Sequence, residues 1–280
     1  MMRHFWKIAL CLAFCSPVFS APGQKLVWSD EFNNSTTPSA PDPHNWTYET
    51  GAGGWGNHEL EDYCAYASQR PPCDSSRPNV FVWKGHLHIV ARRDEHGHYT
   101  SARLKSQGLR SFQYGRIEAR IKIPKGQGFW PAFWMLGDKI DQVQWPACGE
   151  LDIMENIGKE PSTIHGSIHG TGFTGGQIGL PYTLPNHEDF GDAFHVFGLI
   201  WSPGKIQYYV DRPQNIYATF TPKDLPKGAV WPFDSGKFFF LLNLAIGGDW
   251  PGSPDASTQF PQEMLVDYVR VYAGDSLDGR

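Results

Sequence analysis

The chain is poor in cysteine and has no excess of positive charge. Its 280 residues include five cysteines, and 24 Lys and Arg are set against 29 Asp and Glu, for a formal net charge of -5. No basic stretch is interleaved with aromatic residues, so a nucleic-acid partner is not expected. No two cysteines have the Cys-x-x-Cys spacing of a zinc site.

Long hydrophobic runs are also missing, apart from a short one at the N-terminus. Positive charges precede an apolar run over residues 8–14, and small residues follow near position 20. This run is too short to span a membrane. We expect residues 1–20 to be a secretory signal peptide and residues 21–280 to form one secreted, monomeric domain. A lipid anchor at Cys11 or Cys15 is the weaker alternative, because bulky residues stand just before each cysteine.

Removing the leader leaves three cysteines. An oxidising destination favours a bridge between Cys64 and Cys73 across the Pro71-Pro72 turn, with Cys148 left as a buried thiol. The spacing alone does not determine the pairing.

No stretch keeps a helical period for three turns without Pro or Gly. The chain has 30 Gly, 22 Pro and 40 aromatic residues (11 Trp, 11 Tyr and 18 Phe), which favours short strands, tight turns and an aromatic surface suited to sugars. Strands are predicted over residues 80–92, 114–123, 128–136, 163–170, 194–201, 206–210, 237–246 and 263–272. The expected fold class is all-β, with two packed antiparallel sheets.

One stretch, residues 149–156, carries three acids among apolar residues. In a regular strand Glu150 and Asp152 share a face, whereas Glu155 falls on the other. A bulge of one extra residue at Ile153-Met154 would bring Glu155 back to their side. The alternative is an edge strand with a solvated charged face.

Two such glutamates can catalyse glycoside hydrolysis. With the bulge, the carboxyl groups of Glu150 and Glu155 could meet at about 5 to 5.5 Å, the separation that gives retention. Asp152 lies between them, where it can orient Glu150 and raise the pKa of Glu155. On the segment that follows, His165, Ser167 and His169 share one face, and His169 could tune the same group.

Aromatic and glycine-rich segments flank the acidic stretch. Trp130 and Trp134 are in phase on the preceding predicted strand and are candidates for a sugar platform. The flexible loop over residues 51–57 carries Trp55 and Asn57, and such a loop can approach a ligand closely.

Together these segments resemble the laminarinase-like members of glycoside hydrolase family 16, from about residue 26 to residue 273. The motifs that carry the resemblance are residues 28–32, 54–57, 114–120, 130–136, 149–156, 165–170, 242–248, 250–252 and 266–272. Residues 58–63 depart from the family pattern, which leaves the sugar contacts of that loop open.

The resemblance implies a β-jelly-roll with a concave, open cleft for a β-glucan polysaccharide, and no cofactor for catalysis. It gives Glu150 the role of nucleophile, Asp152 that of assisting acid and Glu155 that of acid/base. The implied or candidate sugar contacts are Trp130, Trp134, His169, Asn57, Trp55, Asn243 and Trp250.

The added Met154 resembles the form of the motif found in β-1,3-glucanases. Retaining endo-cleavage of laminarin-type glucan is therefore the expected activity. The alternatives are cleavage of mixed-linkage β-1,3-1,4-glucan, transglycosylation, and a non-catalytic β-1,3-glucan-binding protein, although such binders usually lack one or both glutamates. The resemblance also implies a structural calcium ion at Glu31, the Gly85 carbonyl and Asp267.

Overall fold

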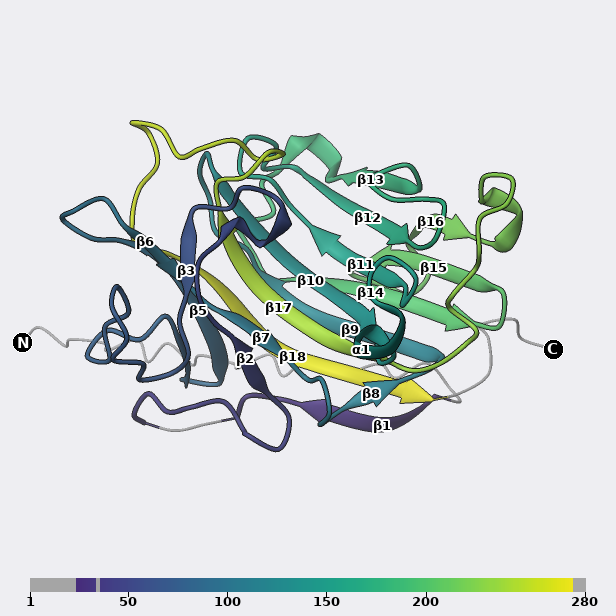
Figure 1. Ribbon diagram of the computed structural model, residues 1–280, viewed down its shortest axis with the longest axis horizontal. Helices are drawn as coiled ribbons and strands as arrows, with labels where there is room; N and C mark the ends of the chain where they lie inside the picture. Colours follow the sequence, from purple (N-terminus) through teal and green to yellow (C-terminus); the bar gives the residue numbers. More distant parts are fainter. Residues whose placement is uncertain (1–23, 34–35, 274–280) are drawn as a thin grey trace, which may run out of the picture.

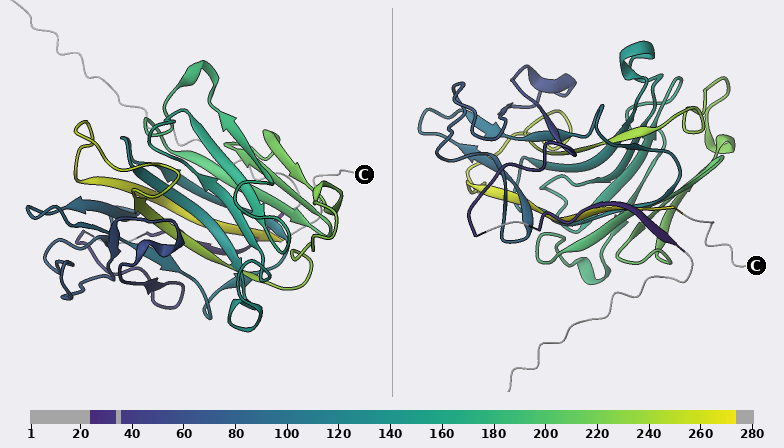
Figure 2. Two further views of the ribbon diagram at one scale, coloured as in Figure 1. Left: turned by 45° about the horizontal axis from the view of Figure 1, so that its top comes forward. Right: turned by 90° about the horizontal axis from the view of Figure 1, so that it is seen from below.

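The computed structural model describes residues 24–33 and 36–273, and these form two stacked β-sheets (Figure 1). The described strands pair antiparallel, except for β3 and β6, which are parallel. Two turned views show the sheets curving over one another (Figure 2). The expectation of an all-β fold with two packed sheets is confirmed.

The larger sheet has ten described strands and the smaller has eight. The larger contains β1 (Lys25–Asp30), β3 (Glu61–Tyr63), β4 (Val80–Trp83), β5 (His86–Arg93), β6 (Tyr99–Ser101), β9 (Gly115–Lys122), β14 (His195–Ser202), β15 (Lys205–Val210), β16 (Ile216–Phe220) and β18 (Gln262–Ala273). The smaller contains β2 (Thr47–Glu49), β7 (Arg103–Lys105), β8 (Ser111–Phe112), β10 (Phe129–Gly137), β11 (Glu150–Glu155), β12 (Thr163–His169), β13 (Gly179–Thr183) and β17 (Phe238–Ile246).

The order of strands in the smaller sheet decides where the site lies. This order is β13-β12-β11-β10-β17-β7-β2, so the acidic strand β11 is an interior strand between β10 and β12. The edge-strand alternative for this segment is therefore wrong. Along the described chain, the one α-helix, α1 (Ile140–Val143), is a single turn in the connection from β10 to β11.

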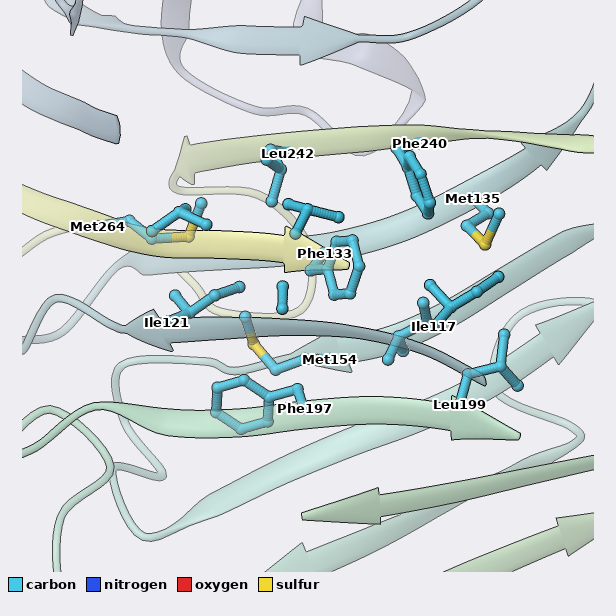
Figure 3. Packing of buried hydrophobic residues seen from close by; sticks show 14 of the residues in the cluster. Ile117, Ile121, Phe133, Met135, Met154, Phe197, Leu199, Phe240, Leu242 and Met264 are labelled. Atoms are coloured by element: carbon cyan, nitrogen blue, oxygen red, sulfur yellow. The ribbon is translucent and has the colours of Figure 1, made fainter. Parts of the chain in front are cut away.

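The core fills the space between the two sheets. Alternate side chains of each strand point inward, and the nine residues of β17 are all buried. Figure 3 shows Met154 of β11 among these inward-pointing side chains, close to Phe197 of the opposite sheet. Because the inner faces of both sheets pack against each other, polar side chains that could form a functional site lie on the outer face of the smaller sheet.

The prediction of one strand over residues 80–92 is wrong. The chain makes a two-residue hairpin there, in which Lys84 has φ 49° and Gly85 has φ 79°. Positive φ at both central residues is the geometry that joins twisted antiparallel strands tightly. The inward-facing positions change phase at this turn, from Val80 and Val82 before it to Leu87 and Ile89 after it. The other predicted strands agree with the structure to within about two residues.

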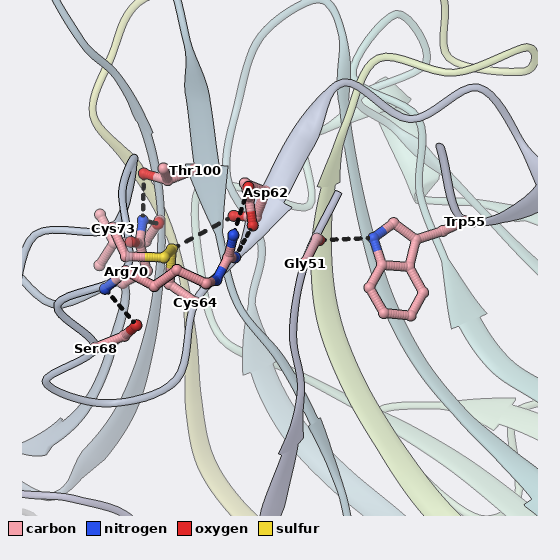
Figure 4. Close-up of a disulfide and its surroundings, with 10 residues drawn as sticks. Gly51, Trp55, Asp62, Cys64, Ser68, Arg70, Cys73 and Thr100 are labelled. Atoms are coloured by element: carbon pink, nitrogen blue, oxygen red, sulfur yellow. Dashed lines mark hydrogen bonds and ion pairs between the residues drawn. A yellow bond between two sulfur atoms is a disulfide. The ribbon is translucent and has the colours of Figure 1, made fainter. Parts of the chain in front are cut away.

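The predicted disulfide is confirmed. Cys64 and Cys73 are bonded, with their Cα atoms 5.8 Å apart, and Cys148 is a free, buried thiol. Asp62 and Arg70 form an ion pair beside the bridge (Figure 4).

The predicted signal peptide, residues 1–20, lies outside the described residues. Within the described ranges, no helix has the length and apolar character needed to cross a membrane.

Candidate active site

A bulge in β11 brings the three acids to one face. Phe133 of β10 pairs with Met154, and the next residue, Trp134, pairs with Asp152, so Ile153 is the extra residue. The same shift occurs on the other side, against β12. The predicted bulge is confirmed.

The extra residue is accommodated by the core. Ile153 and Met154 are consecutive in sequence, yet both side chains are buried among apolar neighbours, 1% and 0% exposed. Two inward residues in a row restore the phase of the strand. Glu150, Asp152 and Glu155 consequently all face outward, into a cleft.

The cleft has a volume of about 350 Å³ and is lined by these three acids. Five of the predicted sugar contacts line it as well, and they come from three segments of the chain. They are Trp55, Asn57, Trp130, Trp134 and Asn243. Sugars stack on such exposed aromatic faces and hydrogen-bond to the polar groups between them.

The other two predicted contacts stand back from this lining. Trp250 packs edge-on against Trp130, with the ring centroids 5.5 Å apart, and also contacts His165. His169 lies behind the acids and touches them directly. We therefore assign Trp250 to the support of Trp130.

Glu150 and Asp152 have different partners. The indole nitrogen of Trp145 donates to Glu150 Oε2 at 2.6 Å, and His169 Nε2 lies 4.0 Å from Glu150 Oε1. Asp152 Oδ2 lies 2.8 Å from His169 Nε2 and accepts a hydrogen bond from Ser167 Oγ at 2.8 Å. His169 therefore bridges Asp152 and Glu150.

Glu155 is held from the opposite side. The indole nitrogen of Trp130 donates to Glu155 Oε1 at 3.0 Å, and Ser167 Oγ is 3.5 Å from Oε2. Trp130 thus both lines the cleft and fixes the carboxyl group of Glu155.

Crowding of carboxyl groups controls their protonation. Burial, followed by the Asp152 carboxylate, raises the pKa of Glu155 to about 8, although His169 and the Trp130 hydrogen bond oppose the shift. The same two causes raise the pKa of Glu150, and His169 again opposes them. Glu155 is therefore suited to hold a proton at neutral pH.

His169 supplies the compensating positive charge. Burial disfavours its charged form, but Asp152, and then Glu150 and Glu155, raise the pKa of His169 to about 9. A protonated imidazole among three acids reduces their mutual repulsion. Glu150, Asp152 and His169 are also the only group among the described residues with three potential metal-ligand atoms within 4.8 Å of one another. The hydrogen bonds above already account for this arrangement.

Among the lining residues that sequence reasoning missed, three have charged or aromatic side chains. Trp145, 49% exposed, lies in the connection before β11, and its dipeptide with Pro146 was an available signal. Arg103 lies between the rings of Trp55 and Trp134, 5.0 and 4.8 Å from their centroids. Glu59 also lines the cleft. Neither Arg103 nor Glu59 stands in a pattern that local sequence could distinguish from a surface charge.

The carboxyl groups expected to bind calcium are both paired with arginine. Glu31 accepts hydrogen bonds from Arg270 at 2.9 and 2.7 Å, which occupy both of its oxygens. Asp267 Oδ2 is 2.7 Å from Arg120 Nη1. Asp267 Oδ1 lies 3.8 Å from His86 Nε2. The expectation that the Glu31 side chain binds the ion does not fit this pairing.

Comparisons of sequence and of structure with known proteins agree on one protein family. The family model described as "Glycosyl hydrolases family 16" matches residues 69–270. A beta-glucanase of Rhodothermus marinus is 38% identical over 97% of this chain and 95% of its own length. The glucan endo-1,3-beta-glucosidase A1 of Niallia circulans is 36% identical over 89% of this chain, which spans 38% of that longer protein.

A solved structure agrees. The endo-beta-1,3-glucanase of Pyrococcus furiosus is 46% identical, with a TM-score of 0.79 over 90% of this chain and 95% of that one. The match includes the two-sheet architecture on which the acids are displayed. The chain belongs to glycosyl hydrolase family 16 and is a glycoside hydrolase.

Proposed function

We propose that this enzyme cleaves β-1,3-glucan of the laminarin type at internal bonds, with retention of anomeric configuration. The observation that carries the proposal is the bulged strand β11, which presents Glu150, Asp152 and Glu155 together in an aromatic-lined cleft. The relatives at 36 to 46% identity include enzymes named for endo-1,3-β-glucan cleavage.

In the first step Glu150 attacks the anomeric carbon. The bond from that carbon to the bridging oxygen breaks, and Glu155 transfers its proton to the departing oxygen. The charged His169 opposes the burial and the Asp152 carboxylate that raise the pKa of Glu150, and together with the Trp145 hydrogen bond it favours the ionised form that the attack requires. The product of this step is a glycosyl ester on Glu150, with Glu155 left as a carboxylate.

In the second step Glu155 acts as a base. It takes a proton from water, whose oxygen attacks the same anomeric carbon, and the ester bond to Glu150 breaks. Both carboxyl groups return to their starting protonation. Asp152 holds His169 and Ser167 in place during the cycle, because it is hydrogen-bonded to both.

The activity is tested by incubating the purified chain with laminarin, mixed-linkage β-1,3-1,4-glucan, agarose and xyloglucan. New reducing ends and a fall in product size are expected with laminarin. Cleavage of mixed-linkage glucan alone would favour that alternative, and products longer than the substrate would indicate transglycosylation. Binding of laminarin without cleavage would show a glucan-binding protein instead.

Retention is tested separately, by following the anomeric proton of the first product by NMR. The β-anomer should accumulate before mutarotation. Initial release of the α-anomer would require an inverting mechanism and would overturn the assignment of Glu150 as nucleophile.

We also propose that a calcium ion stabilises the outer face of the larger sheet. Because the Glu31 carboxylate is occupied by Arg270, the ion would use the main-chain carbonyls of Glu31 and Gly85 together with Asp267. Its contribution would be to stability, since Asp267 lies on β18 and the other two residues adjoin strands of the same larger sheet, away from the acids.

Finally, we propose that residues 1–20 direct export and that residues 21–280 form a single monomeric domain. Sequencing the N-terminus of the exported protein checks the cleavage after Ser20. Light scattering coupled to gel filtration checks the mass. An intact N-terminus, or a dimer, would contradict these two expectations.

A further inference from the structure

A second group of buried polar residues lies beneath one half of the cleft. The cleft crosses the smaller sheet from β11 toward β17 and β7, and at that end it reaches Asn57 and Glu59, just before β3. There Glu59, Glu61 and Tyr63 are 8%, 1% and 0% exposed. None of them takes part in the two chemical steps described above.

Hydrogen bonds connect Glu59 to two walls of the cleft. Asn57 Nδ2 donates to Glu59 Oε1 at 3.0 Å, and the Tyr63 hydroxyl donates to Glu59 Oε2 at 3.0 Å. Asn243 Nδ2 donates to the Tyr63 oxygen at 3.2 Å. In the last hydrogen bond of this series, the Trp134 indole donates to Asn243 Oδ1 at 2.7 Å.

In this series of hydrogen bonds, each donor group faces an acceptor, so all four bonds can form at the same time. Asn57 and Trp134, its two ends, both line the cleft and belong to segments far apart in sequence. Glu59 accepts from Asn57 and from Tyr63 with different oxygens. A single carboxylate therefore fixes one amide and, through Tyr63 and Asn243, one aromatic wall.

Glu61 lies next to this carboxylate and is itself a carboxyl group. Its Oε2 accepts from the main-chain nitrogen of Ile246 at 2.6 Å, whereas its Oε1 is buried and has no donor. Glu59 acts on Glu61 at close range, and a proton shared between the two acids would give this buried oxygen a partner. Burial, and then Glu59, raises the pKa of Glu61 well above its ordinary value.

Among the residues that the structure describes, no ion pair is formed by Glu61. Tyr63 lies on the same strand, Tyr99 is opposite Glu61 on β6, and β17 contributes the Ile246 main chain and Asn243. Arg103 of β7 acts on Tyr63 and is 2.6 Å from Glu49. A neutral Glu61 is thus the form consistent with these neighbours, since two buried carboxylates side by side repel.

We propose that Glu59 and Glu61 are a proton-sharing pair of positioning residues, which hold Asn57 and Trp134 in place for the sugar units bound between β11 and β7. The role of this half of the cleft in glucan binding rests on the proposed function. The positioning of the Trp134 and Asn57 side chains is independent of the proposed function and can be tested without a substrate.

The first test compares three variants by steady-state kinetics on laminarin. Glu59→Gln has one acceptor oxygen for three donors, so KM should rise about tenfold while kcat changes far less. Glu61→Ala should raise KM similarly, because Glu59 loses a donor. Glu61→Gln should restore most of that loss, because its amide donates to Glu59 and accepts from Ile246 as the protonated acid does.

The pH dependence separates positioning from a merely structural role. In the wild type, Glu61 loses its proton as pH rises, and the resulting repulsion should weaken glucan binding. Titration calorimetry with laminari-oligosaccharides in the Glu150→Gln background measures this without hydrolysis. The affinity of the Glu61→Gln protein should hold to higher pH. An identical alkaline loss in both proteins would overturn the proton-sharing pair.

A substrate-free readout is the indole N–H resonance of Trp134, assigned by its absence in Trp134→Phe. Tyr63→Phe and Glu59→Gln should each shift it, because the hydrogen-bond chain is cut. The matched control is Glu118→Gln, a buried carboxyl on the other sheet that pairs with Arg116 at 2.7 Å. It should lower the melting temperature yet leave KM and the resonance unchanged.

These outcomes distinguish the two proposals. If the wild type neither cleaves nor binds laminarin, the proposed function fails, while the Trp134 resonance still decides whether Glu59 positions the cleft. If Glu59→Gln only lowers the melting temperature, as Glu118→Gln does, the positioning role is wrong.

Discussion

Two glutamates of the same strand differ in the partners that surround them. Glu150 accepts from an exposed indole and lies near His169, whereas Glu155 is held by Trp130 and Ser167 on the other side of Asp152. An acid and a nucleophile must differ in protonation at one pH. Burial and Asp152 raise the pKa of both glutamates, so the ionised form of Glu150 depends on its contacts with Trp145 and His169. The residue-scale predictions follow from these contacts.

Replacing either glutamate should abolish most of the activity for a different reason. Glu155→Gln removes the proton donor and should lower kcat by about 10² to 10⁴-fold on laminarin. Glu150→Gln removes the nucleophile and should cost at least as much. An aryl glycoside with an acidic leaving group needs no proton, so its glycosylation rate should recover in Glu155→Gln alone.

Glu263→Gln serves as the control for both variants. It alters a carboxyl group that contacts His88 on the other sheet, at 2.8 Å, and should retain the wild-type rate. A near-native rate for either cleft variant would show that the wrong pair was assigned.

The pH profile should report the protonation of Glu155. Its raised pKa, about 8, means that the acid keeps its proton at neutral pH and loses it as pH rises through that value. Because only the protonated form can transfer a proton to the leaving oxygen, kcat/KM on laminarin should fall on the alkaline side near pH 8. An activity that is flat up to pH 10 would contradict this assignment.

Removing His169 should move the same limb of the profile. The imidazolium lowers the pKa of both Glu150 and Glu155, so His169→Ala should shift the alkaline limb to higher pH. The rate at neutral pH should fall, because Glu150 is then less often ionised. His195→Ala, which removes a histidine 3.1 Å from Asp211 on the other sheet, should leave the profile unchanged.

At the scale of the strand, local sequence was enough to predict the bulge in β11 and its effect, which is to place three acids on one face. Alternation of apolar residues located β9, β10, β12, β14, β15, β17 and β18, because a half-buried strand has period two. It failed at residues 80–92, where a change of phase in the buried positions marks the turn at Lys84-Gly85. Asn57, Glu59, Tyr63 and Asn243 could not be joined in advance, since their contacts depend on how β3 lies against β17.

The disulfide stabilises the folded state by an amount that depends on the length of the loop that it closes. Cys64 and Cys73 are nine positions apart, and a loop of that length restricts the unfolded chain by about 2 to 3 kcal/mol. Cys64→Ser with Cys73→Ser should lower the free energy of unfolding by that amount in chemical denaturation. Reduction of the wild type is the control, because Cys148 has no disulfide to lose.

For the whole molecule, calcium would link strands that lie far apart in sequence. An ion on the carbonyls of Glu31 and Gly85 and on Asp267 would stabilise the folded state by about 2.7 kcal/mol at a concentration 100 times its Kd. Calcium chloride should therefore raise the melting temperature, and EDTA should lower it. The response should disappear in Asp267→Asn.

A matched variant separates the ion from the ion pair. Arg120→Gln breaks the contact with Asp267 but keeps the carboxylate, so its response to calcium should persist. If the wild type melts at the same temperature in EDTA and in calcium chloride, the site binds no structural ion.

The bulge of β11 also constrains how this strand could evolve. Loss of one codon, for Ile153 or Met154, would leave the three acids in phase, because an unbulged strand with alternate acids also presents them on one face. The same loss would empty the space of a fully buried side chain, at a cost of about 2 to 5 kcal/mol. Descendants without the extra residue would need a compensating change in the opposite sheet, near Phe197. A chain that lost this residue would therefore keep its acids on one face but pack its core less well.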